Sequence, residues 1–234
     1  MRNDNVLGNT SELRLAADTA LNMNGYSQSL ASLMMNKDSL VHLNGGTLDI
    51  REGGTVDGIL AGSGNLSVSG GELDISSDNS LLSAAVAIAK EAVVTLTDTS
   101  GMGLGKGDIS LDGELNYRGA ETGLLAGDLS GKGNLNLSES SLTLVGDNSD
   151  FSGNVSVDKD SVLAALTDNA LGTSSVENSG ELRIGFIEKL SNLITGAGNL
   201  VKTGGGITHV TGEAAGYTGD TLVEQGGLIL VFHT

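Results

Sequence analysis

The three histidines are the first residues to consider for metal binding or acid-base catalysis in this chain of 234 residues. His42, His209 and His233 are far apart in the sequence, and none has a second histidine or a cysteine at the spacing of metal ligands. The chain has no cysteine, which excludes disulfides, thiolate metal sites and cysteine nucleophiles. We therefore predict no metal site, and we expect His209 to be a solvent-facing residue of a strand over 207–210.

Serine hydrolysis and phosphate binding also lack their sequence patterns. No serine lies in a Gly-x-Ser-x-Gly elbow or a Gly-Asp-Ser-Gly sequence. The glycine-rich segments 101–107 and 127–133 resemble a phosphate-binding loop only loosely. In the first, Ser100 replaces the opening glycine and Gly107 replaces the hydroxyl that would hold magnesium, and the second fails at both equivalent positions. We interpret both segments as tight turns.

Two acidic clusters could bind calcium, because calcium prefers oxygen ligands. They are Asp147-Asn148-Ser149-Asp150 and Asp158-Lys159-Asp160. Neither has the spacing of an EF-hand, and the chain contains no Gly-Gly-x-Gly-x-Asp tandem. We interpret them as solvated turns, and we predict no catalytic, cofactor-binding or metal-binding residues, no cofactor, and a protein that is not an enzyme.

The amino-acid composition limits the classes of partner that the chain could bind. There are 29 acidic and 12 basic residues, so the formal net charge is −17. The basic residues are scattered singly, which argues against binding to nucleic acid or to an anionic membrane surface. Met1 is followed by no apolar signal segment, and no stretch approaches the roughly 20 apolar residues of a membrane span. We expect an excised fragment with no direct membrane insertion of its own.

Short alternating strands must position these side chains. The chain has 36 glycines and no proline, and glycine turns precede segments in which apolar and polar residues alternate. These segments are 45–50, 70–75, 112–117 and 179–184, and further alternating stretches are 65–69, 134–138 and 141–145. Alternation places Leu and Val on one face of a strand and Ser, Thr and Asn on the other. The pattern predicts an all-β protein made of half-buried strands.

A long internal repeat organises the strands. The pattern Gly-x-Gly-Asn-Leu occurs at 62–66, 131–135 and 196–200, and Phe151-Ser152-Gly153 recurs at nearly the same interval as Tyr217-Thr218-Gly219. These landmarks define a period of about 67 residues, and one third of it, about 22 residues, is enough for three strands and three turns of a parallel β-solenoid. We predict one solenoid of roughly ten coils, in which three coils separate Phe151 from Tyr217 and both rings are plugs at coil corners.

Two segments fit this repeat less well. Residues 81–94 are rich in alanine and could form a short helix capped by Asn79 or Ser80, although several of them also alternate. We favour a strand over 93–97 and leave 81–89 open. Residues 1–40 follow the period poorly, and we expect them to be a degenerate terminal copy.

The C-terminal segment carries a more specific pattern. It reads Gly196-x-Gly-Asn-Leu-x-Lys-Thr-Gly-x-Gly206, then Val210-Thr-Gly, then Tyr217-Thr-Gly-Asp-Thr-x-Val-x-x-Gly-Gly-Leu228. This resembles the passenger-associated repeat of Gram-negative autotransporters, the type V secretion family that includes AIDA-like and pertactin-like adhesins. Weaker echoes occur at 131–157 and 45–75.

The resemblance implies a right-handed, single-stranded parallel β-helix with about three short strands per coil. Residues 1–184 would be passenger coils, and residues 185–234 would be coils of the autochaperone region of the same continuous solenoid. A C-terminal β-barrel translocator, absent from this chain, would carry the passenger to the cell surface, attached to the outer membrane. The implied function is an adhesin or self-association stalk whose partners are that barrel, other copies, or a host or bacterial surface receptor. A polysaccharide hydrolase or lyase on a β-helix is the alternative.

Charge and shape lead to two further expectations. We expect stability to be highest in 185–234, where Phe186, Tyr217 and Phe232 would enlarge the core, and we expect 228–232 to expose an apolar strand edge. A rod of charge −17 repels its copies at low salt, so self-association should strengthen with salt or with falling pH.

Overall fold

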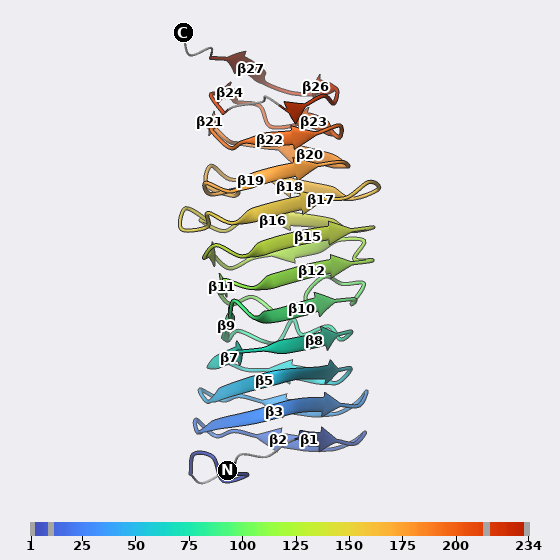
Figure 1. Cartoon of the computed structure of the whole chain (residues 1–234), viewed down its shortest axis with the longest axis vertical. Coiled ribbons are helices and arrows are strands. Elements are labelled where there is room, and N and C mark those ends of the chain that lie inside the picture. Colours follow the sequence, from blue (N-terminus) through green and yellow to red (C-terminus); the bar gives the residue numbers. More distant parts are fainter. Residues whose placement is uncertain (1–2, 9–11, 213–215, 232–234) are drawn as a thin grey trace.

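The protein is a right-handed parallel β-solenoid. The computed structural model describes residues 3–8, 12–212 and 216–231, and within these ranges it is all-β, with parallel strands stacked in about 11 coils (Figure 1). The strands nearest the viewer in Figure 1 run from left to right while the chain climbs from the N-terminus to the C-terminus, which is a right-handed winding. The predicted fold class is confirmed. None of the described residues forms a helix that could span a membrane.

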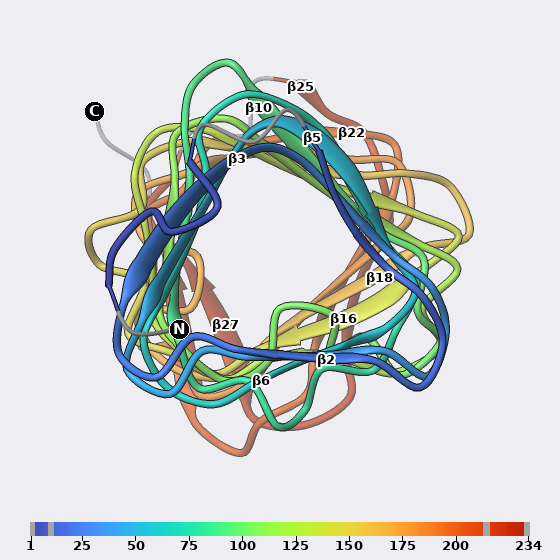
Figure 2. The ribbon, with the colours of Figure 1, turned by 90° about the horizontal axis from the view of Figure 1, so that it is seen from below.

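Each coil has three sides, which the end-on view shows as a triangular outline (Figure 2). We name them sides A, B and C in the order in which the chain follows them. Side A comprises the first halves of β3 (Ser27–Met35) and β5 (Thr47–Val56), then β7 (Asn65–Val68), β9 (Ala85–Ile88), β11 (Ile109–Leu111) and β14 (Leu129–Ser130). After a stretch of turns around Asn148 and Asn169, it continues as β21 (Lys189–Leu190), β24 (Ile207–Val210) and β27 (Gly227–Leu230).

Side B is the longest ladder. It comprises β1 (Glu12–Leu15), the second halves of β3 and β5, β8 (Gly71–Ile75), β10 (Ala92–Leu96), β12 (Glu114–Arg118), β15 (Asn134–Ser138), β17 (Asn154–Val157), β19 (Ser175–Asn178), β22 (Ile194–Gly196) and β25 (Gly216–Tyr217). Side C comprises β2 (Ala20–Asn22), β4 (Leu40–His42) and β6 (Ile59–Ala61), then β13 (Gly123–Leu125), β16 (Ser141–Leu144), β18 (Val162–Ala165), β20 (Glu181–Ile184), β23 (Asn199–Lys202) and β26 (Thr221–Val223).

The length of one coil follows from the register of side B. Leu115 pairs with Leu135 and Leu135 pairs with Val155, so a coil contains about 20 residues. The expectation of roughly ten coils of about 22 residues each is therefore wrong in detail. With about 20 residues per coil, the repeat period of about 67 residues equals three coils plus about one third of a coil, rather than three whole coils.

Successive copies of the repeat consequently lie on successive sides of the solenoid. The Asn-Leu pair of the repeated pattern begins β7 on side A, β15 on side B and β23 on side C. Phe151 and Tyr217 follow the same rule: Phe151 lies at the corner before β17 on side B, and Tyr217 ends side B just before β26. Phe151 and Tyr217 therefore lie at two successive corners of the triangle. The repeat pattern alone predicted one and the same corner for both residues, three whole coils apart. One period of the repeat therefore advances the chain by three coils and one side of the triangle.

The core is a set of inward-pointing aliphatic rows. Leu115, Leu135, Val155 and Val176 stack in one row of side B and are at most 2% exposed. Most strands pair with a neighbour on both edges, and β6, β13, β14 and β21 pair on one edge. A proline in a strand paired on both edges would remove a ladder hydrogen bond, which fits the absence of proline.

Glycines occupy corners where the backbones of adjacent coils approach closely. At Gly131 φ is +101°, and a Cβ would lie 2.2 Å from the Leu111 carbonyl oxygen. Gly101 is also in the left-handed region, at φ +65°. The interpretation as turns is confirmed for residues 101–107, whereas residues 127–133 have bends at both ends and contain β14 between them.

The structure answers one open question, confirms one local expectation and corrects another. Residues 81–89 are not helical: Leu82 bridges to Gly62 and the rest contains β9, because Val86 and Ile88 continue the inward row of side A. The strand expected over 93–97 is β10. The described part of residues 1–40 is regular rather than degenerate, since β1 pairs with β3 in unbroken register and β2 pairs with β4.

The C-terminal coil differs from the expectation of an enlarged core. Phe186 is 70% exposed, Tyr217 is half-buried, and Phe232 lies outside the described residues. Among the described residues no further coil covers β26, so even its inward-facing residues are accessible, and Val223 is 44% exposed. For the described residues 228–231 the expected apolar edge is present.

Candidate functional site

The two histidines that the structure describes, His42 and His209, are not gathered into a site. His209 is exposed on β24, as predicted, and His42 is half-buried on β4 with no hydrogen-bond partner at Nδ1. His233 lies outside the described residues. Within residues 3–8, 12–212 and 216–231, no group of three or more His, Asp or Glu side chains could hold a metal ion.

The acidic clusters are turns at coil corners. Asp147 is exposed, and hydrogen bonds from Ser149 and Asn169 lower the pKa of its carboxyl. Its neighbour Asn148 is buried, accepts a hydrogen bond from the Leu129 amide at 2.7 Å and donates one to the Ala170 carbonyl at 2.6 Å. The amide of Asn148 thus replaces ladder hydrogen bonds where the strand is interrupted. Residues 158–160 form a second exposed turn.

A concave feature lies on the outer surface of side B. Three hollows of about 480, 430 and 450 Å³ follow one another from β10 to β22. Neighbouring hollows share lining residues: Asn136 and Ser156 belong to two of them, and so do Glu114 and Asn134. They form one continuous trough along the rod, which we call the side-B groove.

Two hydrogen-bonded ladders of polar side chains line this groove. In the first, Asn136 Nδ2 donates to Asn116 Oδ1 at 2.9 Å, and Asn116 Nδ2 donates to Thr95 Oγ1 at 3.5 Å. The strand register places these three outward-facing side chains directly above one another. Thr95 and Asn116 are only 2% and 5% exposed although they face outward, and Asn116, which lines one of the hollows, forms part of the groove floor.

The second ladder lies beside the first on β15 and continues onto β17 and β19. Asn154 Nδ2 donates to Asn134 Oδ1 at 3.0 Å, and Ser175 Oγ donates to Asn154 Oδ1 at 2.7 Å. These three side chains are more exposed than the floor. Each side chain in the ladders is held by its neighbour, so the groove presents amides and hydroxyls in fixed positions at every coil.

The charged residues of the groove are mostly acidic. The acidic residues are Glu91, Asp112, Glu114, Glu139, Asp158 and Glu177, and the basic residues are Lys90, Arg118 and Lys132. No histidine or cysteine lines the three hollows, and the one aromatic residue along them, Tyr117, is a buried core residue. The chemistry of this surface is hydrogen bonding and weak electrostatics.

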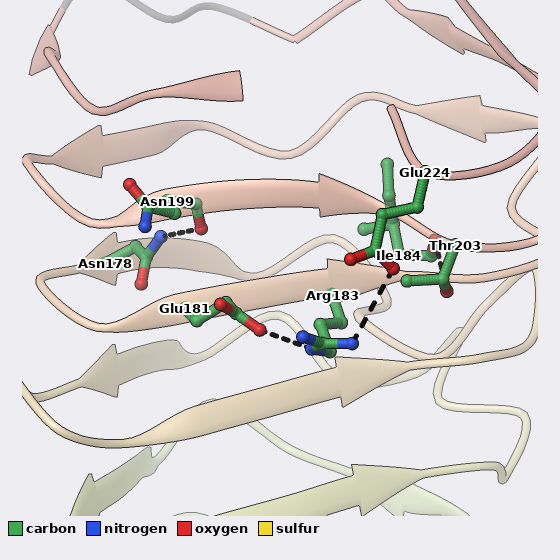
Figure 3. A network of polar contacts seen from close by, with 7 residues as sticks. All are labelled: Asn178, Glu181, Arg183, Ile184, Asn199, Thr203 and Glu224. Carbon is green, nitrogen blue, oxygen red and sulfur yellow. Dashed lines mark hydrogen bonds and ion pairs between the residues drawn. The ribbon is translucent and has the colours of Figure 1, made fainter. Parts of the chain in front are cut away.

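A second polar cluster joins the last coils of side C (Figure 3). Arg183 forms an ion pair with Glu181 beside it and lies 3.9 Å, Nη1 to Oε2, from Glu224 two coils further on. Thr203 Oγ1 donates to the Ile184 carbonyl at 3.2 Å, and Asn178 Nδ2 donates to the backbone of Asn199 at 2.9 Å. The ion pairs are largely solvated, so this cluster joins coils rather than forming a binding site.

A buried lysine was missed by the sequence reasoning. Lys202 occupies an inward position of side C, paired with Ile184 below and Val223 above, and it is 0% exposed. Its Nζ donates to the Gly185 carbonyl at 2.9 Å and to the Gly204 carbonyl. Burial lowers the pKa of the amine. The signal was present in the alternation, since Lys202 falls two positions after the inward Leu200.

The sequence alone also did not predict the side-B groove, although its alternation placed polar residues on the outer faces of these strands. Alternation shows that Asn116 and Asn136 face outward, but only the register places them in contact.

Comparisons with known proteins give two relatives. The chain is 46% identical over 232 residues to the uncharacterized protein YuaQ of Escherichia coli (strain K12), and 35% identical over 225 residues to the uncharacterized lipoprotein YdeK of the same organism. The alignments cover 98% and 95% of this chain but 17% of each relative, so the chain spans about a sixth of their length. No family model and no solved structure matches the chain.

Proposed function

We propose that this chain is a non-enzymatic segment of a cell-surface β-solenoid that acts in adhesion or self-association, as the passenger of an autotransporter. The side-B groove is the observation that carries the proposal, because it repeats hydrogen-bonding side chains along the rod. Such a surface suits binding to an extended partner.

The location is part of the proposal. One relative is called a lipoprotein, which supports an envelope or surface location for this chain, and attachment to the outer membrane through a C-terminal β-barrel follows from the resemblance in residues 196–228. The partners would be that barrel, other copies of the chain, or a receptor on a host or bacterial surface. The coils over 185–234 would promote folding and secretion of the passenger.

Display of the chain on a non-adherent bacterium tests the function. Cells that carry it on an autotransporter barrel should settle faster or adhere more than cells that carry the barrel alone. The effect should grow with salt and with falling pH, because both weaken the repulsion between rods of charge −17. Unchanged settling and adhesion at every salt concentration and pH, with the chain shown on the surface by antibody, would refute the proposal.

The alternative, a polysaccharide hydrolase or lyase, makes a different prediction. Either enzyme would release new reducing ends from a polysaccharide, and a lyase would also create unsaturated sugars. We expect neither product after prolonged incubation of the purified chain with neutral or acidic polysaccharides, and appearance of either would favour the alternative.

Strand-edge mutations separate end-to-end contact from lateral contact. The outermost strand, β27, contains Ile229, and Val231 follows directly after it; these residues are 44% and 40% exposed. Ile229→Lys or Val231→Lys places a charge on this edge. Self-association that persists in both variants is lateral, whereas loss in both shows that copies meet at their ends.

A further inference from the structure

We infer that the side-B groove binds an extended, uncharged polysaccharide whose chain lies parallel to the axis of the solenoid. The inference rests on the proposed adhesive function and names the class of ligand for it. Three properties of the groove support it: its repeat distance, its free hydrogen-bonding groups and its charge.

The repeat distance matches a polymer of sugars. Adjacent coils are one strand spacing apart, about 4.8 Å, and the six strands from β10 to β22 therefore cover roughly 24 Å. A pyranose residue in an extended chain has a length close to one strand spacing. Successive sugars would thus meet equivalent side chains on successive coils, such as Asn116, Asn136 and Ser156.

The hydrogen-bonding groups suit hydroxyls better than a peptide backbone. The strands of side B are paired on both edges, so the groove floor offers no free strand edge to which a peptide could add. The ladders use one of the two Nδ2 hydrogens of Asn136 and of Asn154, which leaves the second hydrogen for a ligand. Serine hydroxyls and amide oxygens add groups that can accept from a sugar.

The charge of the groove argues against other polymeric ligands. Six acidic side chains against three basic ones disfavour anionic glycans and nucleic acids. A second copy of the rod is less suitable because its net charge of −17 would face a groove with six acidic and three basic side chains. Since no outward aromatic side chain lines the groove to stack on a sugar ring, we expect weak affinity built from many hydrogen bonds.

The test uses the purified chain and fluorescently labelled hexasaccharides. The uncharged probes are β-1,4-glucan, β-1,3-glucan, β-1,4-xylan and N-acetylated chitin hexamers, and the anionic probe is a galacturonate hexamer. We expect at least one uncharged probe to bind, with a dissociation constant in the range of about 0.1 to 1 mM, and the galacturonate probe to bind at least tenfold more weakly.

A matched pair of variants locates the site. Ser156→Ile fills the middle of the groove on β17, and Ser67→Ile makes the same change at the same position of an Asn-x-Ser-Val strand on side A. Ser156→Ile should weaken binding at least tenfold, and Ser67→Ile should change it less than twofold. Unfolding temperatures measured by circular dichroism identify any variant that fails to fold, in which case Ser156→Val and Ser67→Val replace the pair.

Several results would overturn the inference. These are no binding of any uncharged probe by the folded chain up to about 10 mM, tighter binding of galacturonate, or equal effects of the two serine variants. A dimer in sedimentation that Ser156→Ile abolishes, without sugar binding, would assign the groove to a second copy and leave the adhesive function standing. Sugar binding by a chain that confers no adhesion when displayed would refute the proposed function alone.

Discussion

The middle of side B and the C-terminal coil carry equivalent repeat positions in different environments. Val157 in β17 and Val223 in β26 are one repeat period apart, occupy matching places after Phe151-Ser-Gly and Tyr217-Thr-Gly, and both point inward. Val157 is 0% exposed and Val223 is 44% exposed. A solenoid gains stability from contacts between neighbouring coils. A residue that a coil covers on one side only therefore stays partly exposed to solvent.

This comparison reverses one expectation from the sequence. The repeat pattern is clearest over 196–228, which suggested that stability peaks there, but the strands β26 and β27 contain no buried residue. A clear sequence pattern indicates that a segment forms a strand. Burial depends on whether another coil covers that strand.

Hydrogen exchange should show the largest difference between the two regions. Amides of β12, β15 and β17 should exchange only through global unfolding, whereas those of β25, β26 and β27 should exchange through local fraying, which costs much less free energy. Limited proteolysis should accordingly remove the C-terminal coil first. Survival of a fragment over 185–234 would contradict this and favour a folding nucleus in that region.

A pair of valine mutations should show the next largest effect. Val157→Ala should lower the free energy of unfolding by about 2 kcal/mol, because it leaves a cavity in a filled row, and Val223→Ala should lower it by about 0.5 kcal/mol or less. Urea denaturation measures both values. Similar decreases in the free energy of unfolding for both variants would mean that the C-terminal coil is covered in solution. Sedimentation would then show whether a second copy of the chain covers it.

Replacement of the buried lysine should stabilise the C-terminal coils. Lys202→Met removes a charge that has carbonyl partners but no carboxylate partner in the described structure, and it should raise the free energy of unfolding at pH 7 by about 1 kcal/mol. The folded state holds Lys202 with a lowered pKa, so the unfolded state binds more protons between that pKa and the ordinary value of 10.5. The stability of the wild-type chain should therefore rise toward that of Lys202→Met as the pH increases through this interval.

Denaturation of both proteins between pH 7 and pH 10 checks this sign. A difference that stays constant with pH would show that Lys202 titrates normally and that packing alone accounts for the change. Lys189→Met, on an exposed residue of β21, is the control and should change little at any pH.

The surface ion pairs should have the smallest effect. Arg183→Ala removes contacts with Glu181 and Glu224 that are largely solvated, and it should cost no more than about 0.5 kcal/mol at low salt. The loss should vanish at high salt because screening weakens exposed pairs. A larger, salt-independent loss would indicate that the aliphatic part of Arg183 packs against Glu224 and holds the last coil.

The sequence alone predicted the class of fold because its evidence is local. Alternation along segments such as 134–138 and 181–184 determines which side chains of a strand are buried, and glycine with a polar residue determines where a strand ends. The same local evidence showed that the two acidic clusters and residues 101–107 are turns, and it needed no knowledge of what lies on the next coil.

The length of a coil was decided only in three dimensions. The repeat period is consistent with three long coils or with three shorter coils plus one side, and the pairing of Leu115 with Leu135 and of Leu135 with Val155 selects the second. The side-B groove and the burial of Asn116 depend on the same register, because they arise from residues one coil apart that no local pattern connects. Local alternation therefore determined the faces of the strands, and hydrogen bonding between coils decided which polar faces share one groove.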